Sequence, residues 1–425
     1  MKKIISLVLV FLLILPYAVS ADISSAGYIK IGLFFGSSAK NSVTLTSDGG
    51  FKIGQGEATY YSEDFALAET QITVSKSADG GFDINGQALG QNEISIKPIG
   101  NKIAVDGVWY RGFIYLKRLD NSDMTVINVV DMEEYLYSVI GQEMSPSWNI
   151  EALKAQAVCA RTYALKNLNT YKSYGFNLCT TQRTQVYLGI KSETERTIQA
   201  VEETRGKTVQ YNGELAEVFY FSSSGGKTAS SKDVWVADLP YLKSVNDIYE
   251  NPKEATNSSW YVTLSADDIK SKLSSRGVDI GTVTSVKITG RGDGDIVTEV
   301  TVTGTAGEYK VKKDSNRSFF GAKSQDFEIT GMSGELTDVY GNSVSSGRTV
   351  LSHTGESKLD LANVSILTEK GVITPDANTS DSITLTGHGW GHKVGMSQWG
   401  AKAMADSGFR YDDILKFYFT GVDIK

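Results

Sequence analysis

The sequence predicts an α+β fold, with a central helical core, antiparallel β-sheet regions and a β-rich region at the N-terminus. Three observations predict this class. Two helical patterns follow each other between residues 129 and 168. Short alternating segments, separated by Gly, Asn and Asp, occupy the chain on both sides of them. Glycine (42 residues) is plentiful and proline (6 residues) is scarce, which is typical of a β-rich globular protein.

Composition and the N-terminus indicate an exported protein that does not bind nucleic acid. The 425 residues suffice for two or three domains, and 49 acidic residues outnumber 42 Lys and Arg without any basic cluster. Lys2 and Lys3 precede the apolar run Ile4–Leu15, and small residues follow at Ala18–Ala21. This pattern is typical of a cleaved signal peptide over residues 1–20, so we expect an extracellular or cell-envelope protein. A retained N-terminal membrane anchor is the alternative, although the run is short for a span.

The chain before the helices is expected to form a small β region. Its strand candidates alternate apolar and polar residues between turn-forming Gly, Asn and Asp. They are Tyr28–Leu33, Ile72–Val74, Ile94–Ile96, Phe113–Leu116 and Met124–Val130. A scaffold is the simpler interpretation of this region, and ligand binding is the alternative.

Two helices are predicted between residues 129 and 168. Asp131 is expected to cap the first helix, with Glu134 completing a capping-box pattern, and Gly141 is expected to end it. The second helix is expected to start after Pro146 with Asn149 as its cap. Its apolar residues recur at steps of three and four, and many are alanines, which let another backbone approach closely.

Glu143 stands on the short connection between these helices and is the candidate catalytic acid. Ser145 precedes a proline and is therefore pushed toward an extended conformation, which stiffens the connection. Met144 and Trp148 place apolar surface nearby in sequence. A carboxyl group beside apolar surface has its neutral form favoured, as a general acid requires near neutral pH. The alternative is an ordinary surface glutamate near a helix end.

Two later segments carry further candidate groups. Thr208–Tyr211 and Glu217–Tyr220 flank Asn212-Gly213, a strong hairpin signal, and the second strand leads into the loop Ser222–Gly226. That loop could offer hydroxyl and N–H groups to a sugar, or be a plain turn. The segment Gly387–Trp399 contains His388 and His392 among glycines that disfavour a helix, so the histidine spacing does not make a zinc-protease motif. For His392 a structural role and a site role both remain open, and Ser397 is expected to cap the helix that follows.

Four ordered motifs carry a family resemblance. They are Glu143-Met144 with Trp148 and EALKAQAVCARTYAL, then TQVYLGI, then FSSSGGKTASSKDVW, and finally GHGWGHKVGMSQWGAKAMADSG. Together they resemble the stage II sporulation protein D family, which includes the LytB amidase enhancers. The resemblance runs from about Val126 to the C-terminus with one insertion. Together with the residue patterns, it divides the chain into an expected signal peptide at 1–20, an N-terminal β-rich region at 22–118, a family-like core at 119–330, a β-rich insertion at 331–381, and the C-terminal part of the core with the GHGWGH motif at 382–425.

The resemblance implies a lytic transglycosylase that cleaves the MurNAc–GlcNAc glycan strands of peptidoglycan. Glu143 would protonate the glycosidic oxygen and then, as carboxylate, accept a proton from the sugar's own 6-hydroxyl, which closes an anhydro ring. Other matching residues would bind the sugar: Gln142, Arg161, Gln185, Tyr187, Ser222, Ser223, Ser224, Gly225, Gly226, His392 and Gln398. The alternative is a non-enzymatic glycan-binding enhancer whose partner is a cell-wall amidase.

The sequence departs from the family pattern at three places. Some relatives have a cysteine- and histidine-rich patch after the position of Cys179, but this chain has no histidine or second cysteine there, so we expect neither metal nor cofactor. Lys393 stands where the family has glycine, and Pro146 falls one place later than in the Glu-Met-Pro form. The two cysteines, Cys159 and Cys179, are compatible with a disulfide or with two buried thiols.

Overall fold

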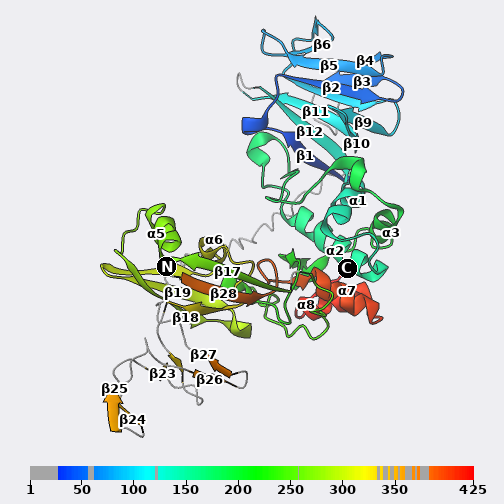
Figure 1. Ribbon diagram of the computed structural model, residues 1–425. Coiled ribbons are helices and arrows are strands. Elements are labelled where there is room, and N and C mark those ends of the chain that lie inside the picture. The colour runs from blue at the N-terminus through cyan, green and yellow to red at the C-terminus, as the bar shows by residue number, and fades with distance from the viewer. Residues whose placement is uncertain are drawn as a thin grey trace, which may run out of the picture. The chain divides into compact units, whose positions relative to one another are not determined.

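The computed structural model describes residues 27–55, 62–119, 123–256, 258–332 and 382–425, together with short strand pairs between residues 336 and 373. It contains helices and several sheets, which confirms the α+β class (Figure 1). The chain forms two compact units. The first contains the chain to Tyr135 and Asn167–Thr184, and the second contains Leu136–Lys166 and Gln185–Lys425. The predicted signal peptide and most of the predicted insertion lie outside the described residues.

The first unit contains two sheets drawn in blue and cyan in Figure 1. A seven-stranded sheet has the order β13-β1-β12-β11-β8-β3-β4, with bounds Leu178–Cys179, Tyr28–Phe34, Met124–Asp131, Phe113–Arg118, Glu93–Pro98, Phe51–Gln55 and Ser62–Leu67. A six-stranded sheet has the order β10-β9-β2-β5-β6-β7, with bounds Val108–Arg111, Lys102–Val105, Ser42–Ser47, Gln71–Lys76, Phe82–Ile84 and Gln87–Ala88. Pairing is antiparallel except between β1 and β13. All five predicted strand segments lie within β1, β5, β8, β11 and β12, so those predictions are confirmed.

The two predicted helices are present and are capped as expected. α1 spans Met132–Glu143, and Asp131 accepts hydrogen bonds from the N–H groups of Glu133 and Glu134. α2 spans Ile150–Lys166, and Asn149 accepts from the N–H of Glu151. The side chains of α2 are buried over most of its length, and the helix packs on α3 (Glu195–Glu202), α7 (Gln398–Asp406) and α8 (Tyr411–Tyr418). Its alanines therefore serve close packing, as predicted.

The prediction that Gly141 ends the first helix is wrong. The helix continues to Glu143, and the N–H of Met144 donates to the carbonyl of Ile140. A Cβ atom at Gly141 would lie 2.0 Å from the carbonyl oxygen of Ser192. Glycine is required there because another segment's backbone lies against the helix, and its role is packing rather than termination.

The second unit carries its own sheets and core. Two three-stranded sheets, β17-β28-β21 and β18-β19-β20, surround one hydrophobic cluster together with α5 (Ala266–Ser274) and α6 (Ser315–Phe320). Their strands are Ser259–Ser265, Ser382–His388, Phe327–Gly331, Val283–Arg291, Val297–Gly304 and Gly307–Lys312.

Short helical elements occur along the whole described chain. They are η1 (Gly36–Ser38), η2 (Lys172–Tyr174), η3 (Gly189–Ser192), η4 (Asp293–Asp295) and α4 (Ser231–Val234). Within the predicted insertion, the pairs β22–β23, β24–β25 and β26–β27 span Leu336–Thr337 with Ser343–Val344, Thr349–Ser352 with Gly355–Lys358, and Ile366–Thr368 with Gly371–Ile373.

The predicted hairpin is present, but its second strand differs. β14 (Val209–Tyr211) pairs with β15 (Glu214–Leu215) across Asn212-Gly213, and both turn residues have positive φ. β14 also pairs with β30 (Asp423–Ile424). The segment predicted to be the second strand instead contributes β16 (Tyr220–Phe221), which pairs in parallel with β29 (Met396–Ser397). This parallel pair brings two distant motifs together.

Candidate functional site around Glu143

Glu143 is the last residue of α1, and its side chain is partly buried. The connection that follows is held by Arg196, whose Nε donates to the Pro146 carbonyl at 2.7 Å and whose Nη2 donates to the Trp148 carbonyl at 2.6 Å. Met144, next to Glu143, is buried. The helix before Glu143 and the connection held by Arg196 after it therefore fix the backbone from which the Glu143 carboxyl group extends.

Two neutral side chains contact the Glu143 carboxyl group. Gln398 Nε2 lies 3.4 Å from Oε2, and the Tyr220 side chain is a second hydrogen-bond partner. Burial raises the pKa of Glu143 above its usual value, and the hydrogen bonds from Tyr220 and Gln398 oppose that rise. The net shift favours the protonated carboxyl group, the form that a general acid needs.

Gln185 extends this group of contacts. Its Nε2 lies 3.3 Å from the Tyr220 hydroxyl and 3.3 Å from the carbonyl oxygen of Ala160 on α2. Gln185 is buried, so its amide is fixed by these partners. The structure thus places two predicted residues, Gln185 and Gln398, in one polar cluster with Glu143, through Tyr220.

Strand pairing explains how the cluster assembles. Tyr220 lies opposite Met396, and Phe221 lies opposite Ser397, in the parallel pair of β16 and β29. Gln398 follows β29 directly as the first residue of α7, and Ser397 caps that helix as predicted by accepting from the N–H of Gly400. Of the two residues that contact Glu143, Tyr220 therefore lies in this strand pair and Gln398 directly follows it.

Two tryptophans lie close to residues of this cluster in the sequence. The rings of Trp148 and Trp399 lie 4.8 Å apart between centroids, and each is partly buried. Trp148 is on the connection after Glu143, and Trp399 follows Gln398. Aromatic faces of this kind provide apolar surface that sugar rings can stack on.

The polar groups of the loop Ser222–Gly226 are engaged within the protein. The buried carboxylate of Glu250 accepts from both the N–H and the hydroxyl of Ser224, from the hydroxyl of Ser223 and from the N–H of Gly225. The hydroxyl of Ser224 in turn accepts from the N–H of Gly226 at 3.1 Å. This geometry gives the loop a structural function, and its predicted role in sugar binding stays a prediction.

His392 occupies an aromatic environment. Its ring centroid lies 6.1 Å, 5.6 Å and 5.2 Å from those of Phe219, Phe221 and Trp235. Its Nδ1 accepts from the N–H of Val394 at 3.1 Å. Burial lowers the pKa of His392 to about 4, and the positive charge of Arg317 adds to the effect. The ring is neutral at physiological pH and supports the bend of the glycine-rich segment.

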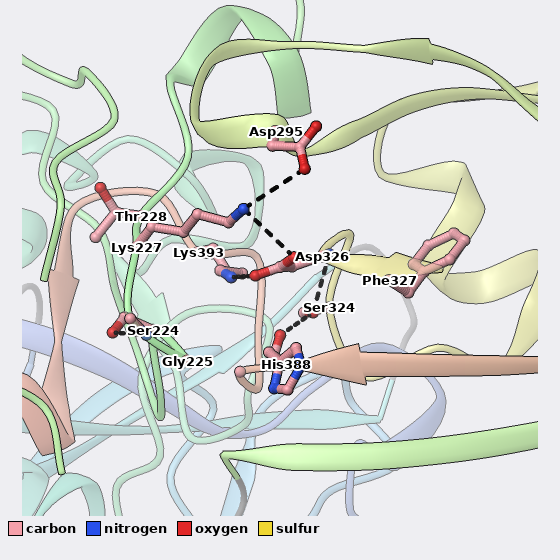
Figure 2. Close-up of polar contacts among 12 residues, drawn as sticks. Ser224, Gly225, Lys227, Thr228, Asp295, Ser324, Asp326, Phe327, His388 and Lys393 are labelled. Carbon is pink, nitrogen blue, oxygen red and sulfur yellow. Dashed lines mark hydrogen bonds and ion pairs between the residues drawn. The ribbon is translucent and has the colours of Figure 1, made fainter. Parts of the chain in front are cut away.

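Lys393 has a positive φ of 64° and is fully buried. Figure 2 shows Lys393 and Lys227 both directed at Asp326, with Nζ–Oδ distances of 2.6 Å and 3.8 Å. Burial lowers the pKa of Lys393, and the charge of Asp326 opposes that shift. The ion pair fastens the glycine-rich segment to the start of β21.

The remaining predicted residues occupy different environments. Arg161 is buried and donates to the carbonyls of Lys207 and Val201, so its guanidinium group joins backbone segments. Tyr187 is buried, whereas Gln142 is exposed beside Glu143 in the sequence. Cys159 and Cys179 are both buried free thiols, which resolves the alternative left open by the sequence.

A cleft of about 310 Å³ in the first unit is lined by Lys30, Lys117, Leu168, Asn169, Lys172, Gly175, Phe176 and Asn177, none of which is a predicted site residue. No group of three or more His, Cys, Asp and Glu side chains suited to a metal ion occurs in the described parts of the chain. Among the helices of those parts, none combines the length and apolarity required to cross a membrane.

Sequence reasoning missed three residues of this site. Tyr220 carried a signal, because it ends a strand candidate just before the Ser222–Gly226 loop. Arg196 and Glu250 carried none, since each resembles an ordinary charged residue in its local sequence.

The chain is similar in sequence to known proteins over the segments that carry this site. The model of the family described as SpoIID, Stage II sporulation protein, matches residues 120–211, which contain Glu143 and Gln185. Stage II sporulation protein D of Bacillus subtilis (strain 168) is 30% identical over 311 residues, which cover 69% of this chain and 74% of that protein. The chain belongs to the stage II sporulation protein D family.

Two further relatives extend the comparison. The Amidase enhancer of Bacillus subtilis (strain 168) is 31% identical over 383 residues, which cover 85% of this chain and 51% of that protein. The chain thus spans about half the length of that relative. An uncharacterized protein of Brachyspira hyodysenteriae is 32% identical over 308 residues, with 72% of this chain and 69% of that protein covered. The sequence similarity to these relatives therefore extends well beyond the segment matched by the family model.

Proposed function

We propose that this protein acts on the bacterial cell wall as a peptidoglycan lytic transglycosylase, with Glu143 as its general acid and base. The observation that carries the proposal is the environment of Glu143. Its carboxyl group is partly buried at a helix end, has a raised pKa and is contacted by two neutral side chains, Tyr220 and Gln398. Membership of the stage II sporulation protein D family supports the cell-wall role.

The chemistry requires one carboxyl group that changes its protonation state. Protonated Glu143 gives its proton to the glycosidic oxygen as the bond from that oxygen to the sugar's anomeric carbon breaks. The oxygen of the muramic 6-hydroxyl then bonds to the anomeric carbon, and its proton passes to the Glu143 carboxylate. The products are an anhydro-ended strand and a strand with a new free hydroxyl, and no water is consumed. A second carboxylate, which hydrolases use as nucleophile or base, is not needed.

The neighbours of Glu143 suit both halves of this cycle. Burial favours the neutral acid before proton transfer, whereas hydrogen bonds from Tyr220 and Gln398 stabilise the carboxylate after it. Trp148 and Trp399 offer aromatic surface for sugar rings. Gln142, next to Glu143, is exposed and available to a polymeric substrate.

A product analysis tests the proposal. Glycan strands without stem peptides would be incubated with the wild-type protein and with Glu143→Gln, and the products identified by mass spectrometry. Glu308→Gln provides a matched control, because Glu308 is an exposed glutamate on β20. The proposal is supported if anhydro-ended fragments form with the wild type and with Glu308→Gln but not with Glu143→Gln. Fragments with reducing muramic ends would instead indicate a hydrolase.

The second proposal is a non-enzymatic enhancer of a cell-wall amidase, favoured by the relative named Amidase enhancer. In that case the groups around Glu143 bind glycan, and a purified amidase is the partner. Stimulation of amidase activity by wild type and Glu143→Gln alike, without any glycan cleavage, would support this function. Either function places the protein outside the cytoplasm, in agreement with the signal peptide expected at residues 1–20.

A further inference from the structure

We propose that Glu250 is a positioning residue whose buried carboxylate ties β16 to β29 and thereby holds Tyr220 and Gln398 against Glu143. This inference rests on the proposed acid–base role of Glu143. Glu250 lies in the segment after α4 and contributes to no strand or helix. Its side chain is buried, with a residue exposure of 5%.

The carboxylate of Glu250 collects donors from two distant segments. From the loop that follows β16 it accepts the Ser223 hydroxyl, the Ser224 hydroxyl at 2.9 Å, the Ser224 N–H at 2.6 Å and the Gly225 N–H at 3.0 Å. From β29 it accepts the Ser397 hydroxyl at 2.7 Å. A buried carboxylate is tolerated only when its lone pairs are satisfied, and these five donors satisfy them. One charged group therefore joins the loop after β16 to β29.

The tether acts on the residues that touch Glu143. Tyr220 is three residues before Ser223, and Gln398 directly follows Ser397. Ser397 also caps α7 by accepting from the N–H of Gly400 at 3.2 Å, so the same hydroxyl fixes the start of the helix that carries Gln398. β16 and β29 are only two residues long, and so short a pair depends on side-chain contacts for its register.

The segment that carries Glu250 is itself anchored. Asp247 accepts from the Glu250 N–H at 3.2 Å and from the Tyr418 hydroxyl at 2.8 Å, and its own N–H donates to the carbonyl of Gly226. Tyr418 belongs to α8, which packs on α2. The segment of Glu250 is therefore bonded to the helical core through Tyr418 and to the loop through Gly226.

The tether predicts a measurable effect on Glu143. Hydrogen bonds from Tyr220 and Gln398 lower the pKa of Glu143, so loosening them raises that pKa further. Removing the negative charge of Glu250 without any displacement would act in the opposite direction, because fewer negative charges favour ionisation of a carboxyl group. The sign of the change in pKa separates positioning from a plain charge effect.

The test measures the pKa of Glu143 by ¹³C NMR of glutamate-labelled protein, with the resonance assigned by its loss in Glu143→Gln. Glu250→Gln and Ser223→Ala are compared with the wild type. Ser324→Ala is the matched control. Ser324 is fully buried, as Ser223 is, but its hydroxyl donates to the backbone carbonyl of His388 (Figure 2). Glycan cleavage is measured on the same samples.

We expect the pKa of Glu143 to rise by about half a unit or more in both tether variants and to stay unchanged in Ser324→Ala. The kcat for glycan cleavage should fall roughly tenfold, with KM changed less than about twofold, because positioning acts on the transition state. An unchanged or lowered pKa in both variants would overturn the inference, and if Glu250→Gln does not fold, Ser223→Ala alone decides. The NMR measurement does not depend on glycan cleavage. If the pKa of Glu143 rises in the tether variants but the wild type never cleaves glycan, the positioning role of Glu250 is supported and the transglycosylase proposal is wrong.

Discussion

Gln398 Nε2 lies 3.4 Å from Oε2 of Glu143, although 255 positions separate the two residues in the chain. The contact depends on the parallel pairing of β16 with β29, which places Gln398 at the start of α7 beside the end of α1. It joins the two motifs that stand farthest apart in the family pattern. The acid of the proposed reaction and its closest amide donor are thus supplied by opposite ends of the family core.

Replacing this amide should change both rate and pH dependence. Gln398→Leu removes a hydrogen bond that lowers the pKa of Glu143, so the pKa should rise and the basic limb of the activity profile should move to higher pH. We expect kcat to fall by about a hundredfold, the lower end of the effect of losing one preorganised donor. A pH–rate profile measures both. Gln199→Leu, an exposed glutamine on α3, should leave the profile unchanged, and an unmoved basic limb in Gln398→Leu would contradict the assignment.

The raised pKa of Glu143 also predicts a pH-dependent cost in stability. Above the ordinary value of 4.5, the folded protein binds the Glu143 proton more tightly than the unfolded chain does. Stability is therefore lost as pH rises through the raised pKa, and Gln at this position avoids that loss. We expect the Tm of Glu143→Gln to equal that of the wild type near pH 4 and to exceed it by about 1–2 °C at pH 8. Calorimetric scans at both pH values check this, and a difference independent of pH would contradict it.

Gly141 should be intolerant of the smallest side chain. In Gly141→Ala the new Cβ atom would lie 2.0 Å from the Ser192 carbonyl oxygen, so α1 or the Ser192 segment has to move. We expect a loss of about 2 kcal/mol or more in the free energy of unfolding, measured by denaturant titration. Gln142→Ala changes the next, exposed residue of the same helix and should stay within about 0.5 kcal/mol of the wild type. Equal stabilities for the two variants would show that the contact is easily relieved.

His392 should titrate far below an ordinary histidine. Its ring is surrounded by Phe219, Phe221 and Trp235, and burial lowers its pKa to about 4. The chain has 3 histidines, so imidazole NMR signals can be followed individually against pH. We expect one ring to remain neutral down to about pH 5, and its signal to be lost in His392→Phe. An assigned His392 signal that titrates above pH 6 would contradict the aromatic environment.

The sequence predicted the helices and strands wherever local signals were strong. Asp131 and Asn149 cap the helices as expected, and strands from Tyr28 to Val130 form where alternation predicted them. Gly141 misled the prediction because a glycine required for close packing looks the same in sequence as one that ends a helix. The second strand of the hairpin was misplaced because Glu214–Leu215 pairs with β14, whereas Tyr220, the last residue of the predicted strand, pairs with Met396 near the C-terminus.

The site was only partly predictable for a related reason. Motif resemblance singled out Glu143, Gln185 and Gln398, which the structure places in one polar cluster with Tyr220. It could not separate residues that face a ligand from residues that hold those residues in place, because both kinds recur within a motif. The hydroxyls of Ser223 and Ser224 in the Ser222–Gly226 loop donate to Glu250. Glu250 has no local sequence signature, so this structural role of the hydroxyls could not be predicted.

Glu143 is proposed here as the acid of a transglycosylase. The most direct measurement is mass spectrometry of glycan strands digested by wild type, Glu143→Gln and Glu308→Gln. We predict anhydro-ended fragments from wild type and Glu308→Gln, and a loss of at least about a thousandfold in Glu143→Gln, because the variant keeps the shape of the side chain and lacks only its proton. Equal cleavage by Glu143→Gln and wild type would contradict the account.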